Sequence, residues 1–230
     1  MKNLTIIALL LFSFISLTAQ EKKDANSFIK EGNEAYKNKK YEEAFISFKQ
    51  AIALFEAENK VDTPLVYNTG YCAYKSKKYD EALPYFNKSI ELNYKKSKPF
   101  IYKAQILSKN KKYKEMETTL KEGLELYSSD KNLNKLMASC FFKQGLVFYK
   151  EGNKIKKAAN ESGMNKTDPE KFKAEYAKAN AKFNEALPLI EKAYEYHNKN
   201  KSVLKALINI YSNIGKKDKA EKIKKELEAL

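Results

Sequence analysis

Apolar residues recur every three to four positions over most of the chain, as they do on one face of an amphipathic helix. Near the C-terminus, Ala220, Ile223, Leu227 and Leu230 form one such stripe, and lysines and glutamates fill the positions between them. A stripe of this period marks the face of a helix that packs against a neighbour. Because only seven glycines and five prolines occur in 230 residues, the pattern predicts an all-α protein with short turns. We expect the last helix, with its polar outer face, to cap and complete the domain.

The first residues differ from the rest because they form a continuous apolar stretch. Lys2 precedes an apolar run from Leu4 to Leu17, and Ala19 offers a small residue for cleavage. This order of a basic residue, an apolar core and a small residue is typical of a secretory signal. We therefore predict a signal peptide over residues 1–19 and a mature domain over residues 20–230.

A membrane span is the competing interpretation of this segment. The apolar run is shorter than the about 20 residues that cross a bilayer, and charged residues follow it directly. No cysteine precedes Cys72, which argues against a bacterial lipid anchor at the cleavage site. The prediction is an exported protein in the periplasm of a Gram-negative bacterium, either soluble or held at the outer membrane by a partner.

The remaining sequence repeats itself, which indicates a stacked-repeat architecture. Residues 31–52 and 69–92 carry the same residue types at one constant displacement. Later matches recur at a slightly shorter displacement, from Gly70 to Ala104 and by the same step to Ala138. A small residue at such a place lets two helices approach within the about 8–10 Å of close packing. In the first two repeats, Gly32, Ala35, Tyr36, Tyr41, Ala44 and Phe48 recur as Gly70, Ala73, Tyr74, Tyr79, Ala82 and Phe86.

These positions resemble the tetratricopeptide repeat family, whose unit is a helix-turn-helix with small residues at the helix crossing and aromatic residues beside them. The resemblance covers essentially all of residues 25–230 and is most specific in the first two repeats. It implies a right-handed superhelical stack of about five units. Since one unit cannot bury its apolar stripes alone, neighbouring units must share a core. We expect the units at about residues 25–58, 63–96, 97–130, 131–197 and 199–230.

The fourth unit departs from the repeat pattern. Where a turn would follow Gly145, helical sequence continues to about Ala159. A break near residues 162–164 and a capping sequence with proline at 167–169 then precede a second amphipathic helix. We predict a helical hairpin with elongated helices around residues 146–182. Two interpretations stay open, namely a docking arm for a partner and a tolerated insertion without a role.

Composition limits the chemistry that the chain can perform. The net charge is +15, and all 44 basic residues are lysines because the sequence contains no arginine. Arginine is the preferred reader of phosphates and bases, so a nucleic-acid partner is not expected. The sequence has no glycine-rich phosphate loop, paired-histidine metal motif or nucleophile elbow. We therefore predict no catalytic, cofactor-binding or metal-binding residues, and a protein that is not an enzyme.

The cysteines and the histidine have structural explanations. Cys72 and Cys140 occupy equivalent positions two repeats apart, a separation larger than a disulfide can bridge. We expect two buried, unpaired thiols that act as small core residues. His197 lies near the expected end of a second helix, where a positive charge complements the helix dipole.

The family resemblance also implies a binding surface, because the inner faces of the first helices line a concave groove for an extended peptide or a helix. Lys37, Lys75, Lys109 and Lys143 recur at one position of four successive units and would form a basic ladder. Lysine is also favoured there by the dipole of a helix C-terminus alone. A basic and aromatic surface favours a ligand with acidic groups and apolar anchors. Carried over by position, the groove residues are Asn33, Tyr36, Lys37, Tyr67, Asn68, Tyr71, Tyr74, Lys75, Lys98, Ile101, Lys109, Ser139, Phe142 and Lys143.

The sequence therefore predicts a protein-protein interaction scaffold or adaptor of the bacterial cell envelope. Its partner would be another exported protein, bound through the groove, the hairpin or both. The alternative is lysine-driven binding of an acidic envelope polymer or glycan, whose affinity would fall steeply with salt.

Overall fold

The computed structural model describes residues 24–230, and the predicted signal peptide at 1–19 lies outside them. Within residues 24–230 every regular element is a helix and no strand occurs, which confirms the all-α fold class. The chain divides into two compact units, one ending at Tyr94 and one beginning at Lys95. Unit 1 and unit 2 are described separately below.

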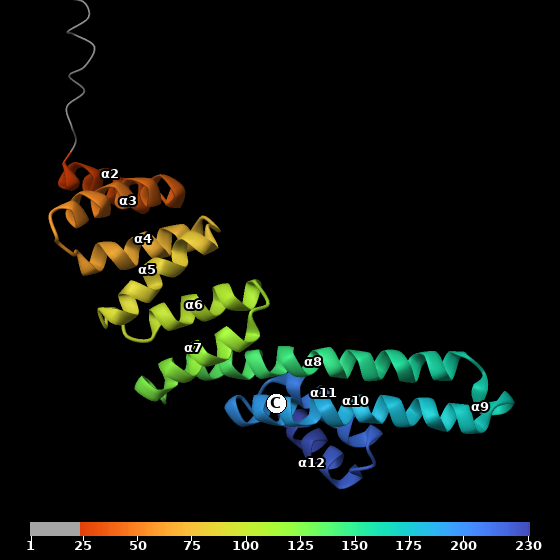
Figure 1. Cartoon of the computed structure of the whole chain (residues 1–230). Coiled ribbons are helices and arrows are strands. Elements are labelled where there is room, and N and C mark those ends of the chain that lie inside the picture. The colour runs from red at the N-terminus through yellow and green to blue at the C-terminus, as the bar shows by residue number, and fades with distance from the viewer. Residues whose placement is uncertain (1–23) are drawn as a thin grey trace, which may run out of the picture. The chain divides into compact units, whose positions relative to one another are not determined.

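Unit 1 consists of two antiparallel helix pairs (Figure 1). Its helices are α2 (Ala25–Lys37), α3 (Tyr41–Ala57), α4 (Thr63–Lys75) and α5 (Tyr79–Glu91). Consecutive helices pack on one another, and the rings of Phe48 and Phe86 are buried in the shared core. A Cβ atom at Gly32 would lie 2.4 Å from Phe48 Cδ1, which is closer than packed carbon atoms approach. Glycine therefore stands at this crossing because no side chain fits between α2 and α3.

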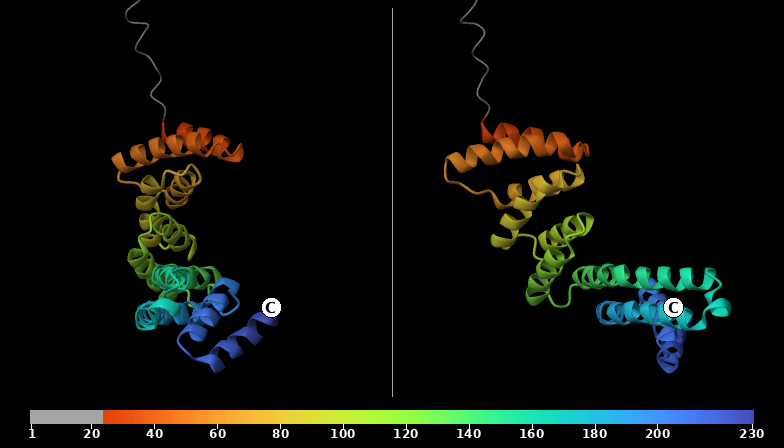
Figure 2. Two further views of the ribbon diagram at one scale, coloured as in Figure 1. Left: turned by 90° about the vertical axis from the view of Figure 1, so that its right-hand side faces the viewer. Right: turned by 45° about the vertical axis from the view of Figure 1, so that its right-hand side comes forward.

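Unit 2 contains the remaining helices, which Figure 2 shows from two further sides. They are α6 (Lys98–Lys109), α7 (Tyr113–Leu126), α8 (Lys131–Glu161), α9 (Met164–Thr167), α10 (Pro169–Tyr196), α11 (Lys201–Asn213) and α12 (Lys217–Glu228). α6 packs against α7 and α8, α8 runs along α10, and α11 lies between α10 and α12. The predicted crossing residues Ala104 and Ala138 are completely buried, so the small-residue crossings persist where the sequence repeat is weak.

The turns inside the helix pairs share one backbone conformation. Lys39, Lys77 and Lys111 adopt left-handed φ angles of 59°, 63° and 58°. The following amide then donates to a carbonyl in the last turn of the preceding helix, as from Lys40 N to the carbonyl of Ala35 at 2.9 Å. This bond satisfies a carbonyl that the end of the helix leaves free. Between α11 and α12 a glycine, with a φ of 80°, takes the left-handed position instead.

Helices α8 and α10 form the predicted elongated hairpin (Figure 1). α8 spans 31 residues and α10 spans 28, whereas α2, α4 and α11 span 13 each. A Cβ atom at Gly152 would lie 2.8 Å from Phe183 Cε1, so glycine allows the two long helices to lie close together. The chain reverses at Gly163, whose φ is 69°, and Asp168 Oδ1 caps α10 by accepting from Lys171 N at 3.1 Å. The predicted break and restart of the hairpin are confirmed.

Helix α11 is joined to α8 near the C-terminal end of that long helix. Lys156 Nζ, on α8, donates a hydrogen bond to Asn213 Oδ1 at the end of α11. The same ammonium group lies 5.4 Å from the ring centroid of Tyr176 on α10, within cation–π range. One lysine therefore joins three helices, a contact that the apolar pattern alone could not predict.

The last helix packs through a shorter stripe than expected. Ala220 and Ile223 are buried and Leu227 is half-buried, but Leu230 is 45% exposed. Leu230 lies beyond Glu228, where α12 ends, so its side chain is not held on the helix face. None of the helices formed by residues 24–230 is long and apolar enough to cross a membrane.

Candidate protein-interaction surfaces

Three tyrosines from both helix pairs of unit 1 meet and form what we call the tyrosine cluster. Tyr36 comes from the last turn of α2, Tyr41 begins α3 and Tyr71 lies in α4. The ring centroids are separated by 6.0 Å between Tyr36 and Tyr41 and by 6.1 Å in each of the other two pairs. Rings at these distances and tilted geometries attract one another beyond simple area burial. The cluster therefore joins the first helices of two successive repeats.

The tyrosine cluster remains accessible. Tyr36 keeps 38% of its surface exposed, and Tyr71 is half-buried. Partial burial, and then the neighbouring Tyr71, raise the pKa of the Tyr36 hydroxyl above its ordinary value, so it stays neutral and can donate a hydrogen bond at neutral pH. Half-exposed aromatic rings with a polar tip are typical of protein interfaces.

Tyr74 lies in the same region but pairs with a different ring. It is half-buried, and its centroid lies 5.8 Å from that of Tyr79 at the start of α5. Tyr36 and Tyr41 are the equivalent residues of the first repeat, and they make the same pairing at 6.0 Å. The repeated contact between the end of a first helix and the start of a second helix fixes these rings in both repeats.

Lysines at helix ends add positive charge beside the rings. Lys75 Nζ lies 5.3 Å from the ring centroid of Tyr41, a cation–π contact. Lys37, Lys75 and Lys109 are the last residues of α2, α4 and α6, and all three are exposed. The helix dipole favours a cation at these ends, so the geometry supports the structural explanation of the lysine positions. A binding role of the ladder stays a prediction.

Tyr67 belongs to the core of unit 1 and not to its surface. It is 7% exposed, and its ring lies 6.3 Å from that of Phe86 and 5.8 Å from that of Tyr94. Tyr67 and Gly70 are one helical turn apart on α4 and share the face that packs on α5. We therefore correct the prediction that Tyr67 lines a groove. Asn33 is exposed and Asn68 is half-buried, so both stay available.

A hollow of about 400 Å³, which we call the amide–lysine groove, lies between α6 and α8 in unit 2. Two predicted residues, Lys98 and Ile101, are part of it. The lining residues from α8 were missed. Asn132 and Lys135 are three apart, and Lys135 is four before the predicted Ser139, so all three share one helix face. Of the described residues that line the groove, none carries a carboxylate. Its lining is Lys98, Ile101, Tyr102, Gln105, Asn132, Lys135 and Leu136.

The other candidates on α8 continue the same helix but have different surroundings. Ser139 and Phe142 are half-buried. Lys143 lies inside the long helix rather than at a helix end, and its Nζ donates to Ser108 Oγ of α6 at 2.6 Å. The ammonium group of Lys143 is therefore used in packing α8 against α6. The four lysines do not share one environment.

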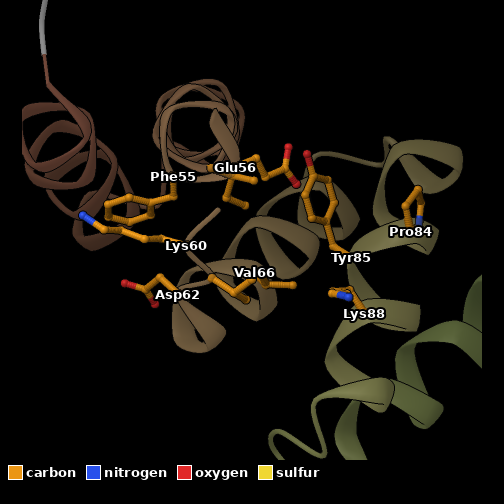
Figure 3. A pocket seen from close by; sticks show the side chains of 10 residues that line it. Phe55, Glu56, Lys60, Asp62, Val66, Pro84, Tyr85 and Lys88 are labelled. Carbon is orange, nitrogen blue, oxygen red and sulfur yellow. The ribbon is translucent and has the colours of Figure 1, made fainter. Parts of the chain in front are cut away.

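A second hollow, the α3–α5 recess, was not predicted from the sequence. It lies in unit 1, has a volume of about 320 Å³ and is built mainly from the second helices of the two pairs (Figure 3). Its position separates it from the tyrosine cluster, because none of the cluster residues lines it. The recess is lined by Ile52, Phe55, Glu56, Lys60, Val61, Asp62, Val66, Pro84, Tyr85 and Lys88.

The cysteine and histidine side chains occupy structural positions. No group of three or more His, Cys, Asp or Glu side chains that could hold a metal ion occurs among residues 24–230. Cys72 and Cys140 are buried and free, and their predicted burial is confirmed. Burial raises the pKa of the Cys72 thiol to about 12, so it is not a nucleophile near neutral pH. His197 follows α10 directly, as expected for a residue at a helix C-terminus.

Comparison with known proteins agrees with this arrangement of helix pairs. Residues 65–96, which include most of α4 and all of α5, match the family model of the tetratricopeptide repeat. Together with the repeated helix pairs, this match supports a protein of the tetratricopeptide repeat family. Folds of this family generally serve as protein-protein interaction scaffolds and are typically non-enzymatic. No curated protein matches the sequence.

The solved structures that resemble this chain come from proteins with low sequence identity. MamA from Desulfovibrio magneticus RS-1 is 14% identical with a TM-score of 0.52, over 90% of this chain and 94% of that one. YrrB, described as a tetratricopeptide repeat protein with an unusual peptide-binding site, is 18% identical with a TM-score of 0.50, over 91% and 88%. A repeat protein from Bacteroides fragilis is 23% identical with a TM-score of 0.42, over 82% and 98%.

Proposed function

We propose that this chain is an exported scaffold of a bacterial cell envelope that binds another protein as an extended peptide or a helix. The tyrosine cluster carries the proposal, because it presents the half-exposed rings of Tyr36 and Tyr71 from successive first helices beside Lys75. Rigid aromatic rings supply much of the energy of protein interfaces, since they bury a large area at a small entropy cost. The mechanism is surface complementarity and includes no catalytic step.

The amide–lysine groove supports a particular partner chemistry. Lys98 and Lys135 attract acidic groups, while Ile101 and Leu136 offer an apolar floor. An acidic segment with apolar or aromatic anchors fits such a surface, and like-charged segments are disfavoured. The peptide-binding site named for YrrB is a precedent for a peptide ligand on this fold.

Photo-crosslinking in intact cells tests the partner proposal. A photoreactive phenylalanine analogue at Tyr71 is expected to capture one or a few envelope proteins. The same analogue at Ile46, which is 50% exposed on α3 and outside the cluster, is the matched control. A partner captured from position 71 and lost with Tyr36→Ala supports the proposal. Identical adducts from positions 71 and 46 would contradict it.

The salt dependence of binding distinguishes this function from attraction to an acidic polymer. Binding that rests on neutralised charges loses affinity steeply as salt rises, because counterions are released. Binding through tyrosine rings depends weakly on salt, since buried contacts are little screened. The partner identified by crosslinking should therefore stay bound to the unmodified protein at about 0.5 M salt. That concentration is well above the ionic strength at which surface charges are screened over about 10 Å. Complete release at that concentration would favour the polymer interpretation.

Export is proposed from the sequence of residues 1–19. The protein is expected in the periplasm of a Gram-negative bacterium, soluble or held at the outer membrane through its partner. Mass spectrometry of the protein recovered from the periplasmic fraction should give a chain that begins at Gln20. A cytoplasmic protein that retains residues 1–19 would overturn the assignment.

A further inference from the structure

The first helix pair of unit 1 carries one extra turn that the second pair lacks. α3 spans 17 residues and α5 spans 13, and the crossing residues Ala44 and Ala82 lie further apart in the sequence than Gly70 and Ala104 do. When the two helices are aligned on these alanines, the last residue of α5, Glu91, corresponds to position 53 of α3, yet α3 continues to position 57. The additional turn is residues 54–57. In the sequence it is an insertion relative to the second repeat.

The extra turn builds one wall of the α3–α5 recess. Phe55 and Glu56 both belong to residues 54–57, and both line the recess. Figure 3 shows them on one side of the opening and Tyr85 of α5 on another. A helix that stopped at the length of α5 would leave this side of the hollow open. The insertion and the recess are therefore one feature of the chain.

The recess has the character of a socket for an apolar side chain. Ile52 and Val66 are buried at its base, and Phe55 and Tyr85 are half-buried at its walls. Val61 lies at the opening and is 57% exposed, in a turn that is otherwise polar. Ligand pockets usually have volumes of about 300–1,000 Å³, so a recess of about 320 Å³ suits a single side chain or a short segment.

The charges around the opening are not balanced. Lys60 Nζ pairs with Glu58 at 2.8 Å, and Lys88 Nζ pairs with Glu91 at 3.1 Å. Neither Glu58 nor Glu91 lines the recess, so both lysines are neutralised from outside it.

Neither carboxylate of the lining pairs with a lysine among residues 24–230. Asp62 Oδ1 accepts only from the backbone N–H of Leu65, at 2.9 Å, and no lysine pairs with Glu56 among residues 24–230. Figure 3 shows the Glu56 carboxylate beside the hydroxyl end of Tyr85. Burial, and then the charge of Glu56, raise the pKa of the Tyr85 hydroxyl, which agrees with this proximity. Among residues 24–230, the Glu56 carboxylate is therefore left without a lysine partner, in a protein whose net charge is +15.

We propose that the α3–α5 recess is a second docking site, which takes an apolar side chain of a partner segment whose neighbouring residue is Lys or Arg. The apolar side chain enters between Phe55 and Tyr85, and the cation pairs with Glu56 at the opening. The site goes beyond the proposed function, because its lining shares no residue with the tyrosine cluster or the amide–lysine groove. It also selects a basic segment, whereas the amide–lysine groove favours an acidic one. One molecule would then hold two segments of opposite charge at the same time.

Methyl NMR with two short probes tests the proposal on the mature chain. The probes are N-acetyl-Phe-Lys-amide and N-acetyl-Phe-Glu-amide, which share the apolar group and differ in charge. The methyl groups of Ile52, Val61 and Val66 report binding at the recess itself. We expect saturable shifts of these methyls with a dissociation constant roughly two- to fivefold lower for the lysine probe, as for a single exposed ion pair.

Three variants assign the preference to the recess. Glu56→Gln should bring the two probes to equal affinity, and Glu43→Gln, an exposed carboxylate in the first turn of α3, should leave the preference unchanged. Val61→Ser, in an exposed turn, should weaken both probes equally without unfolding the protein. Absence of saturable shifts at millimolar probe, equal affinities in the unsubstituted protein, or a preference for the glutamate probe would each overturn the proposal.

Discussion

Ser97 Oγ donates a 2.5 Å hydrogen bond to Asp130 Oδ2, and this bond joins the start of α6 to the start of α8 in unit 2. The second carboxylate oxygen of Asp130 accepts from the backbone N–H groups of Asn132 and Leu133 at 2.8 and 3.0 Å. One side chain therefore caps α8 and fixes it against the preceding first helix. The cap on α8 and the bond from Ser97 can be tested separately.

Two substitutions of Asp130 should destabilise unit 2 by different amounts. Asp130→Ala removes the cap and leaves Ser97 without its acceptor, and we expect a loss of about 1–2 kcal/mol in the free energy of unfolding. Asp130→Asn keeps an oxygen for the cap and should cost less. Urea unfolding at pH 7 measures both losses. Equal stability of the alanine variant and the unsubstituted protein would show that the cap contributes nothing.

The same carboxylate should make stability depend on pH. Burial alone would raise the pKa of Asp130, but the hydrogen bonds from Ser97, Leu133 and Asn132 outweigh it and lower the pKa below the ordinary value of 3.8. A group with a lowered folded pKa contributes its full stability above the unfolded value and loses it as pH falls through the folded value. The stability difference between the protein and Asp130→Asn should therefore be constant above about pH 5 and shrink below about pH 4. A difference that grows on acidification would reverse the sign we assign.

Gly32→Ala should destabilise the protein, although glycine-to-alanine changes inside helices usually stabilise by about 1 kcal/mol. The new Cβ would lie 2.4 Å from the buried ring of Phe48, which must move or shift α2 away from α3. We expect a loss of about 1–3 kcal/mol in thermal or urea unfolding. The double variant with Phe48→Leu should lose less than the sum of the two single losses, because the smaller side chain removes the clash. Additive losses would show that the crossing is looser than described.

The two thiols should be unreactive in the folded protein. Burial raises the pKa of Cys72 to about 12, and burial is also the main reason that the pKa of Cys140 is raised. The thiolate is the reacting form, so a disulfide reagent at about pH 8 should modify neither residue until denaturant is added. Rapid release of the reagent chromophore by the folded protein would contradict the burial of one of them. Single Cys→Ala variants would then identify which thiol reacts.

Tyr194→Phe should loosen α12, with an effect that disappears in alkali. Tyr194 Oη donates to Glu226 Oε2 at 2.6 Å, and this bond, followed by partial burial, raises the pKa of the hydroxyl to about 12. Removal of the hydroxyl should cost about 1–2 kcal/mol at neutral pH. Because the folded pKa is raised, the contribution is complete below the unfolded value near 10 and is lost as pH rises toward 12. Tyr196→Phe, which keeps its ring stacked on Phe141 at 5.8 Å, is the control and should cost little.

Much of the fold follows from local pattern. The crossing residues Gly32 and Ala104 could be found because a close helix contact excludes larger side chains, and that restriction is visible in the sequence as a period. The hairpin could be found because apolar residues continued with helical spacing past Gly145, where the other repeats turn. Both deductions use only spacing along one helix. They required no knowledge of how helices rotate against their neighbours.

The surfaces depend on that rotation, and here the sequence was less informative. Tyr67 was placed on the surface by analogy of position, but the orientation of α4 turns it against Phe86 instead. Tyr41 was recognised as a repeated position, yet its part in the tyrosine cluster depends on Tyr71, which belongs to the next repeat. The α3–α5 recess was missed because it depends on the exact end of α3. The longer spacing between the first two repeats was the available signal.

The left-handed turns affect the thermal stability of the protein. Lys39, Lys77 and Lys111 hold a conformation that costs an L-residue with a side chain about 1–2 kcal/mol, whereas Gly215 holds it without that cost. Three linkers between helices are thus built less favourably than the one before α12. The protein should therefore melt at a lower temperature than the same fold with glycine at these three positions. Placing glycine there, as in the turn between α11 and α12, should raise the melting temperature.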